Sequence, residues 1–336
     1  MKTYKGSMLV AVLGLLAMAA CGGVKVEATS AEDGGGTAPA VSTAKVTLAG
    51  QAVKGPLHAA TVTLYTLNSD GTLGASLATT TTDDTGHWTT QGNFAGPVAI
   101  VVTGGSYTDE ATGNPVDNKP EDQLITWLDQ VKDAMSIAST PLTTIAVQRA
   151  NKHASQGLAT AIANANKEVA DLFKLSGIDI TQSEVDDLTG PAAKDPARKN
   201  AAQYGLALAA LTQVARDKGI APGQVMQMIR DFAEDFSDGT LDGKDGEHAL
   251  ETFPSLNPAE ALQALDTAEA NFLHGERNHS EWTEESMETI NATSSTSTTI
   301  DTSNHTTTEG HTSTDSNTHT IGGEPGATTM NPMPSP

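Results

Sequence analysis

Cysteine is nearly absent from this sequence of 336 residues, in which Cys21 is the only one. An exported chain tends to use cysteines in pairs, so a lone thiol indicates a role other than a disulfide bond. Aromatic residues are scarce at 4%, which predicts modest domains built on Ala, Val, Leu and Ile. Basic residues are outnumbered, with 19 Lys and Arg against 41 Asp and Glu and a net charge of -22. Because phosphate backbones and anionic lipid surfaces repel such a chain, we expect no nucleic-acid partner.

The first residues have the layout of an export signal. Lys2 and Lys5 precede the apolar run 8–20, and small residues lead up to Cys21. The run has 13 residues, whereas a membrane-spanning helix needs roughly 20. We therefore expect no uncleaved anchor, and the sequence shows no second apolar run of spanning length.

Residues 16–22 (LAMAACG) resemble the lipobox of bacterial lipoprotein signals, in which the cysteine becomes residue one and carries the lipid. The resemblance implies that 1–20 is a lipoprotein signal peptide and that Cys21 is the lipidation site, so the membrane is a partner through palmitate-type acyl chains. It also implies a bacterial cell-envelope location, and Gly22 favours the outer membrane and the cell surface. A simple secretory signal cut near Ala20 is the alternative, because Met18 stands where a lipobox usually has leucine.

Composition divides the remaining chain into four zones. Residues 21–43 are rich in Gly, Ala, Thr, Ser and acidic residues, which predicts a flexible linker. Strand-like patterns fill 44–138, and helical patterns fill 139–276. Residues 277–336 are rich in Thr and Ser and carry no Lys or Arg after Arg277, which predicts a disordered acidic tail. The fold class that we expect is segregated α+β, a small antiparallel β-sandwich followed by an α-helical bundle.

The strand predictions rest on alternation and on turn residues. Residues 61–66 alternate polar and apolar side chains, and 98–102 form an apolar run between glycine-containing turns. Asp and Gly residues at 68–71 and 83–86 mark turns. Residues 124–137 fit either one helical face or two short strands, and we favour two strands that extend the sandwich.

Three segments resemble a carboxypeptidase regulatory-like domain: 50–57 (GQAVKGPL), 60–65 (ATVTLY) and 82–88 (TDDTGHW). The resemblance implies a transthyretin-like sandwich of seven strands, which serves as an accessory module in many proteins. It implies no peptidase chemistry. Together with 104–113 (GGSYTDEATG) and 140–144 (TPLTT), it resembles an arrangement that recurs in bacterial surface lipoproteins, in which a helical domain follows the sandwich.

Helix signals begin at Thr140, which is placed to cap a helix that has Pro141 at its first position. Residues 157–173 are rich in alanine, and apolar residues recur at helical spacing in 225–236 and after the capping pattern 257–260. We expect four or five helices. Alanine-rich helices bury little area each, so the bundle is expected to depend on contacts with the sandwich.

One acidic segment is a candidate Ca²⁺ site. Residues 235–247 contain five acidic side chains and three glycines, and Asp238, Asp242 and Asp245 are the candidate ligands. The spacing does not follow that of an EF-hand loop. The alternative, a helix end followed by Asp-Gly turns, is the interpretation that we favour.

Catalytic patterns are missing from the sequence. It contains no GxSxG, no Walker loop and no compact histidine pattern, so we expect no enzyme and, apart from the candidate Ca²⁺ site, no cofactor. Two functions remain open. One is a lipid-anchored protein with a structural, adhesive or other interaction role toward an unknown envelope protein. The other is a carbohydrate-binding lipoprotein in which Trp88 and Tyr107 stack on the rings of a polysaccharide.

Overall fold

The structure, a computed structural model, describes residues 45–287 apart from 191–194, 246–247 and 250–257. The predictions for the signal peptide, for the linker up to residue 43 and for the chain after residue 287 lie outside the described residues. None of the described helices is long and apolar enough to cross a membrane.

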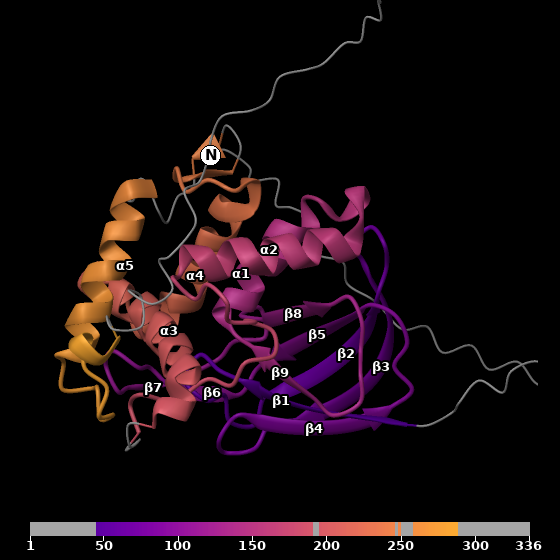
Figure 1. The fold of residues 1–336 in the computed structure, drawn as a ribbon, viewed down its shortest axis with the longest axis horizontal. Helices are drawn as coiled ribbons and strands as arrows, with labels where there is room; N and C mark the ends of the chain where they lie inside the picture. The colour runs from indigo at the N-terminus through magenta and orange to yellow at the C-terminus, as the bar shows by residue number, and fades with distance from the viewer. Residues whose placement is uncertain (1–44, 191–194, 246–247, 250–257, 288–336) are drawn as a thin grey trace, which may run out of the picture. The chain divides into compact units, whose positions relative to one another are not determined.

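Within the described residues, seven strands form a sandwich of two sheets (Figure 1). The four-stranded sheet has the order β3-β2-β5-β8, and the three-stranded sheet has the order β4-β1-β9. A short hairpin of two further strands lies beside the sandwich and carries Tyr107 of the segment 104–113. The strands of the sandwich and of this hairpin are β1 Val46–Ala52, β2 Thr61–Leu67, β3 Leu73–Thr81, β4 His87–Gly92, β5 Val98–Thr103, β6 Ser106–Thr108, β7 Pro115–Asp117, β8 Leu124–Leu128 and β9 Met135–Ser139. A separate short pair is formed by β10 Lys244–Asp245 and β11 His248–Ala249.

The alternation that predicted β2 places Val62 and Leu64 in the core. The ambiguous stretch 124–137 forms β8 and β9, as we predicted. The prediction of an antiparallel sandwich is wrong for one pair of strands, because β9 pairs with β1 in parallel. After β8 the chain crosses from one sheet to the other, so β9 reaches β1 running in the same direction.

Five α-helices are described, which agrees with the expected number. Thr140 caps the first helix, where its hydroxyl accepts the N–H of Thr143 and Pro141 is the first residue. The spans predicted at 157–173 and 225–236 are also helical, and Pro196 begins a 3-10 turn that leads into the third helix. The helices are α1 Pro141–Asn151, α2 Leu158–Leu172, α3 Lys199–Asp217, α4 Val225–Asp235 and α5 Pro258–Leu273.

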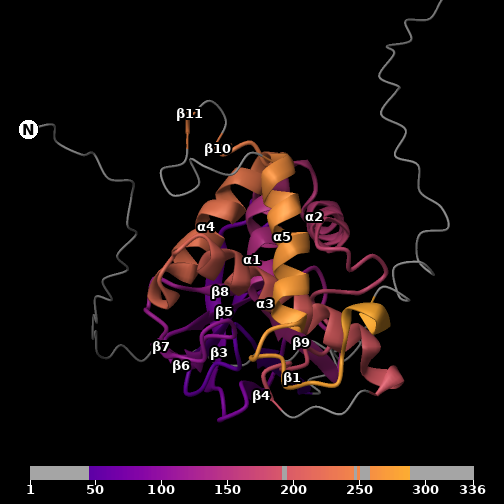
Figure 2. The ribbon, with the colours of Figure 1, turned by 90° about the vertical axis from the view of Figure 1, so that its left-hand side faces the viewer.

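The helices and the sandwich share one apolar core. Buried residues from β1 to α5 belong to a single continuous cluster, and α1 packs on β8 while α5 packs along α3 (Figure 2). The boundary after residue 138 is therefore a change of secondary structure and not a gap between two cores. The expected dependence of the helices on these contacts stays a prediction.

A buried ion pair joins the sandwich to α3. Lys54 is 0% exposed, and its Nζ lies 2.6 Å from Oε2 of Glu110 and 2.7 Å from Oγ1 of Thr212 on α3. The other carboxylate oxygen of Glu110 accepts the N–H of Gly55 at 2.7 Å. The same ammonium group lies 5.0 Å from the centre of the Tyr107 ring. Every polar atom of the pair thus has a partner, as burial of two charges requires.

The chain is folded beyond residue 277, where we predicted that the tail begins. Trp282 is 3% exposed and Met287 is 6% exposed, and both belong to a second apolar cluster with Phe272 of α5 and Leu206 of α3. Asn278 fixes the turn by donating its side-chain N–H groups to backbone carbonyls. The prediction was wrong here because Trp282 and Met287 supply apolar surface inside a stretch that is otherwise polar.

Candidate functional site

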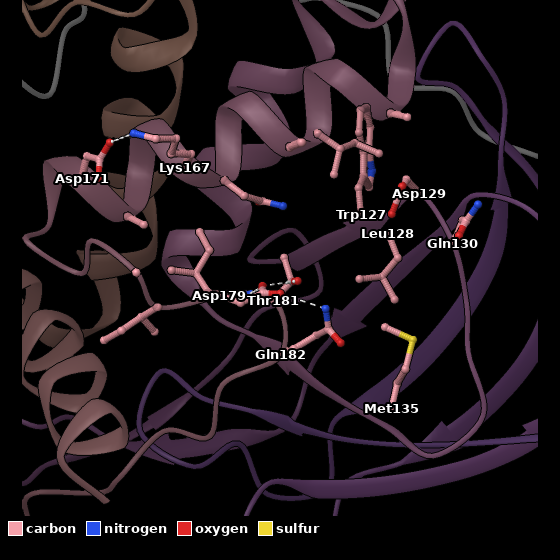
Figure 3. Close-up of a pocket in the computed structure, with 18 of the residues that line it drawn as sticks. Trp127, Leu128, Asp129, Gln130, Met135, Lys167, Asp171, Asp179, Thr181 and Gln182 are labelled. Atoms are coloured by element: carbon pink, nitrogen blue, oxygen red, sulfur yellow. Dashed lines mark hydrogen bonds and ion pairs between the residues drawn. The ribbon is translucent and has the colours of Figure 1, made fainter.

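A groove of about 1080 Å³ lies between α2, the segment that follows α2, and the β8–β9 end of the sandwich (Figure 3). Its walls combine apolar and polar side chains. Lys167 and Asp171 of α2 lie on one side, and Leu128, Gln130 and Met135 lie on the other. A volume of this size exceeds that of most small-molecule pockets, so the groove can hold a segment of a larger partner.

The sandwich wall is held by the loop between β8 and β9. Oδ1 of Asp133 accepts the N–H of Thr47 at 3.0 Å, and the N–H of Ala134 binds the carbonyl of the same threonine at 3.2 Å. Ala134 has a positive φ of 59°, an unusual value for a residue other than glycine, and it turns the chain into β9. The loop is therefore fixed to β1 while Asp129, Gln130 and Lys132 line the groove.

The opposite wall is held by the segment after α2. Oδ1 of Asp179 accepts the N–H and the hydroxyl of Thr181, and Oδ2 accepts the amide of Gln182 (Figure 3). The carbonyl of Thr181 then accepts the N–H of Ala138 on β9 at 2.8 Å. This bond joins the segment to the edge of the three-stranded sheet, so the two walls of the groove are linked at one end.

The helix wall combines small residues with one ion pair. The side chains of Ala159, Ala163 and Ala170 are short, so the face of α2 that lines the groove leaves space for a ligand. Lys167 donates to Asp171, and this hydrogen bond raises the pKa of Lys167. Partial burial raises the pKa of Asp171, but the hydrogen bonds from Lys167 and Ser176 outweigh it, so the pKa lies below its usual value.

Four other polar side chains line the groove: Asp129, Gln130, Lys132 and Asn166. Within the described residues, the structure shows no hydrogen bond or ion pair from any of these four side chains. A carboxylate, two amides and an ammonium group are thus available to a ligand above an apolar floor that includes Leu128 and Ile162. Such a surface has the hydrogen-bonding groups and the apolar area that binding and orienting a ligand require.

The described part of the acidic segment, 235–245, leads from the end of α4 through a 3-10 turn and bends into the short strand β10. The α4 helix ends at Asp235, whose Oδ1 accepts the backbone N–H groups of Asp242, Gly243 and Lys244 at 3.0 to 3.2 Å. Burial raises the pKa of Asp235 despite these bonds. Gly239 and Gly243 have positive φ values, as Asp-Gly turns require. This agrees with the interpretation of a helix end followed by turns.

The proposed Ca²⁺ ligands do not form a cluster within the described residues. Asp238 accepts the N–H and the hydroxyl of Thr240, and these bonds lower its pKa. Asp242 lies 3.5 Å from the ammonium group of Lys244. The side chain of Asp245 lies outside the described residues. Among the residues that the structure describes, no group of three or more His, Cys, Asp or Glu side chains is placed to hold a metal ion.

The two aromatic candidates for sugar stacking are buried, since Trp88 and Tyr107 are each 4% exposed. The Trp88 ring lies directly over Gly50, where any side chain would collide with it. Burial raises the pKa of Tyr107, and its ring packs under Lys54. In this conformation neither ring offers a face to a sugar. Cys21 lies outside the described residues.

Sequence reasoning did not find the groove or the Lys54–Glu110 pair. Residues 54 and 110 both fall inside motifs that were singled out, 50–57 and 104–113, but nothing local indicates that they meet. Asn166 lies among alanines on α2, and a polar residue there is ordinary for an exposed helix face.

Comparisons with known proteins identify no family. No family model matches the chain, and no curated protein matches it. Among solved structures, a 9R-lipoxygenase from Cyanothece PCC8801 is similar over 39% of this chain and 26% of that chain, at 15% identity and a TM-score of 0.19. This chain thus spans about a quarter of the length of that protein, and a likeness at this TM-score carries no argument.

Proposed function

We propose that this chain is a lipid-anchored bacterial cell-envelope protein with a non-catalytic interaction role. The observation that carries the proposal is the position of Cys21, the only cysteine, directly after a basic start and the apolar run 8–20. In this proposal the lipid holds the chain at the outer membrane, residues 21–43 act as a spacer, and the folded residues face the cell surface.

The finer fold assignment belongs to the same proposal. We propose that the sandwich is a transthyretin-like, carboxypeptidase regulatory-like module. Three motif segments support this assignment by their positions. Segment 50–57 contains the end of β1, 60–65 contains the start of β2, and 82–88 contains the turn before β4. A module of this kind commonly serves as an accessory domain, which suits binding better than catalysis.

The groove between α2 and the β8–β9 end is the contact site in this proposal. It has a volume of about 1080 Å³, and its two walls are fixed by hydrogen bonds to the backbone. It also offers polar side chains for which the described part of the chain shows no partner. A rigid site with unused hydrogen-bonding groups loses little entropy when a partner binds.

Membrane fractionation with a labelled fatty acid tests the anchor. We expect the full chain to carry label and to sediment with membranes, and the Cys21→Ser variant to lose both properties. Sedimentation of Cys21→Ser with membranes to the same extent as the native chain would contradict the anchor. Protease treatment of whole cells tests surface exposure, because a chain that faces the periplasm is protected until the outer membrane is opened.

Affinity capture from intact envelopes tests the contact site. The Asp129→Lys variant reverses an exposed charge in the groove, and Asp117→Lys makes the same change on β7, away from the groove. We expect Asp129→Lys to lose the partners that the native chain and Asp117→Lys retain. Equal capture by all three proteins would place the contact elsewhere.

A further inference from the structure

The outer edge of β9 is open at one position. The strand lies at the end of the order β4-β1-β9, so only one of its edges pairs within the sheet. Successive peptide groups of a strand point to opposite edges. The carbonyl of Ser139 accepts the N–H of Val53, which continues β1, and the N–H of Ala138 binds Thr181 on the other side. Even-numbered residues of β9 therefore direct their peptide groups away from β1.

Ser136 is the even-numbered residue that remains. It is exposed, and within the described residues the structure shows no partner for its N–H or its carbonyl on the outer edge. Met135 on one side of it lines the groove, and so does Thr181, which covers the edge two residues further on. The open peptide group thus borders the groove. An uncovered strand edge is a template for pairing with another chain.

We propose that the groove binds an extended peptide, which pairs with β9 at Ser136 and lays alternate side chains against the groove floor. This inference rests on the proposed function, because it names the partner of the same contact site. A strand added here would pair with the same edge of β9 on which Thr181 accepts the N–H of Ala138. Main-chain hydrogen bonds supply affinity in this mode of recognition, and the side chains that point into the groove supply specificity.

Charge and the groove floor restrict the peptide. A net charge of -22 attracts cationic segments and repels acidic ones. In the groove itself the exposed Asp129 and Lys132 offset each other, so the preference for a cationic peptide comes from the charge of the whole chain. Leu128, Ile162 and Ile178 supply the apolar part of the lining. Because side chains of a strand alternate, the fitting peptide has apolar residues at every second position and Lys or Arg between them.

The test uses the full-length chain, purified with its lipid in detergent micelles, and an immobilised library of short peptides that alternate apolar and basic residues. Peptides that bind are then measured by fluorescence anisotropy. Ser136→Pro removes the outward N–H and keeps the pairing with β1, since proline is tolerated on a strand edge. Ser136→Ala is the matched control, because it removes the hydroxyl and keeps the N–H.

We expect Ser136→Pro to weaken binding about tenfold, which corresponds to the loss of one hydrogen bond of about 1.4 kcal/mol. Ser136→Ala should bind as the native chain does. On the native chain, the bound peptide should slow amide hydrogen exchange at Ser136. Methylation of alternate peptide nitrogens should abolish binding in one register and leave it unchanged in the other, and this readout does not depend on how well Ser136→Pro folds.

Several results would overturn the proposal. One is that no library peptide slows amide hydrogen exchange at Ser136. Another is that Ser136→Pro binds peptide as tightly as Ser136→Ala does. A third is that every N-methylated peptide binds equally well. A dimer that forms without peptide and disappears in Ser136→Pro would assign the edge to a second copy of the chain. The mass of the same purified sample reports the lipid on Cys21, so failure of the peptide site is distinguished from failure of the anchor.

Discussion

Substitution of Lys54 by methionine tests whether the sandwich and the helices form one folding unit. Methionine keeps most of the length of the side chain and removes its charge, which leaves the Glu110 carboxylate buried without the ammonium group that lies 2.6 Å away. Removal of one partner from a buried ion pair costs about 3 to 5 kcal/mol. Thr212 and the N–H of Gly55 still donate to Glu110, so we expect the lower half of this range.

Thermal unfolding followed by circular dichroism and tryptophan fluorescence measures the effect. For a domain of this size, a loss of about 3 to 4 kcal/mol lowers Tm by about 6 to 16 °C. Both signals should move together, because Lys54 lies in the sandwich and Thr212 lies on α3. Lys218→Met, which removes an exposed lysine just after α3, is the control and should change Tm little.

The double variant completes the test. When Glu110→Gln accompanies Lys54→Met, no buried charge is left alone, so the combined cost should be smaller than the sum of the two single costs by about 0.5 to 3 kcal/mol. Additive costs would refute the reasoning. So would a Lys54→Met protein that loses less than about 1 kcal/mol, or one whose helices and sandwich melt in separate transitions.

Three further predictions concern other parts of the fold. Burial raises the pKa of Glu269 on α5 to about 7 from 4.5, so its contribution to stability is fully present below pH 4.5 and is lost as the pH rises through 7. Glu269→Gln should therefore stabilise the protein at pH 8 by about 1 to 3 kcal/mol and leave Tm at pH 4 nearly unchanged; an equal shift at both pH values would contradict this cause. Trp282→Ala should cost about 3 to 5 kcal/mol locally and expose the bond after Arg277 to trypsin, while equal cleavage of native and variant protein would show that the segment is not anchored. Ca²⁺ or a chelator should leave Tm within about 1 °C, because Asp235 and Asp238 already have N–H partners; a rise with Ca²⁺ would restore the ion site at Asp238, Asp242 and Asp245.

Elements with strong local signals could be predicted from the sequence. The alternation in β2 and the apolar run in β5 are local patterns typical of strands. Thr140 and Pro141 are the cap and the first residue of α1, so they predict where that helix begins. These features depend on residues a few positions apart. They were therefore readable without knowledge of the tertiary structure.

Features that depend on distant residues could not be predicted. The parallel pairing of β9 with β1 follows from the crossing between sheets, and Lys54 and Glu110 meet across 56 residues. The groove is likewise a product of packing, since it needs α2, the Asp179 turn and β9 together. The predicted tail failed for a related reason, because Trp282 is informative only once the cluster around Phe272 exists.

The mass of the intact chain, purified from membranes, tests the central proposal most directly. We predict a polypeptide that begins at Cys21 and carries acyl chains on that residue. A chain cut at another position, or one with an unmodified thiol at Cys21, would contradict the account.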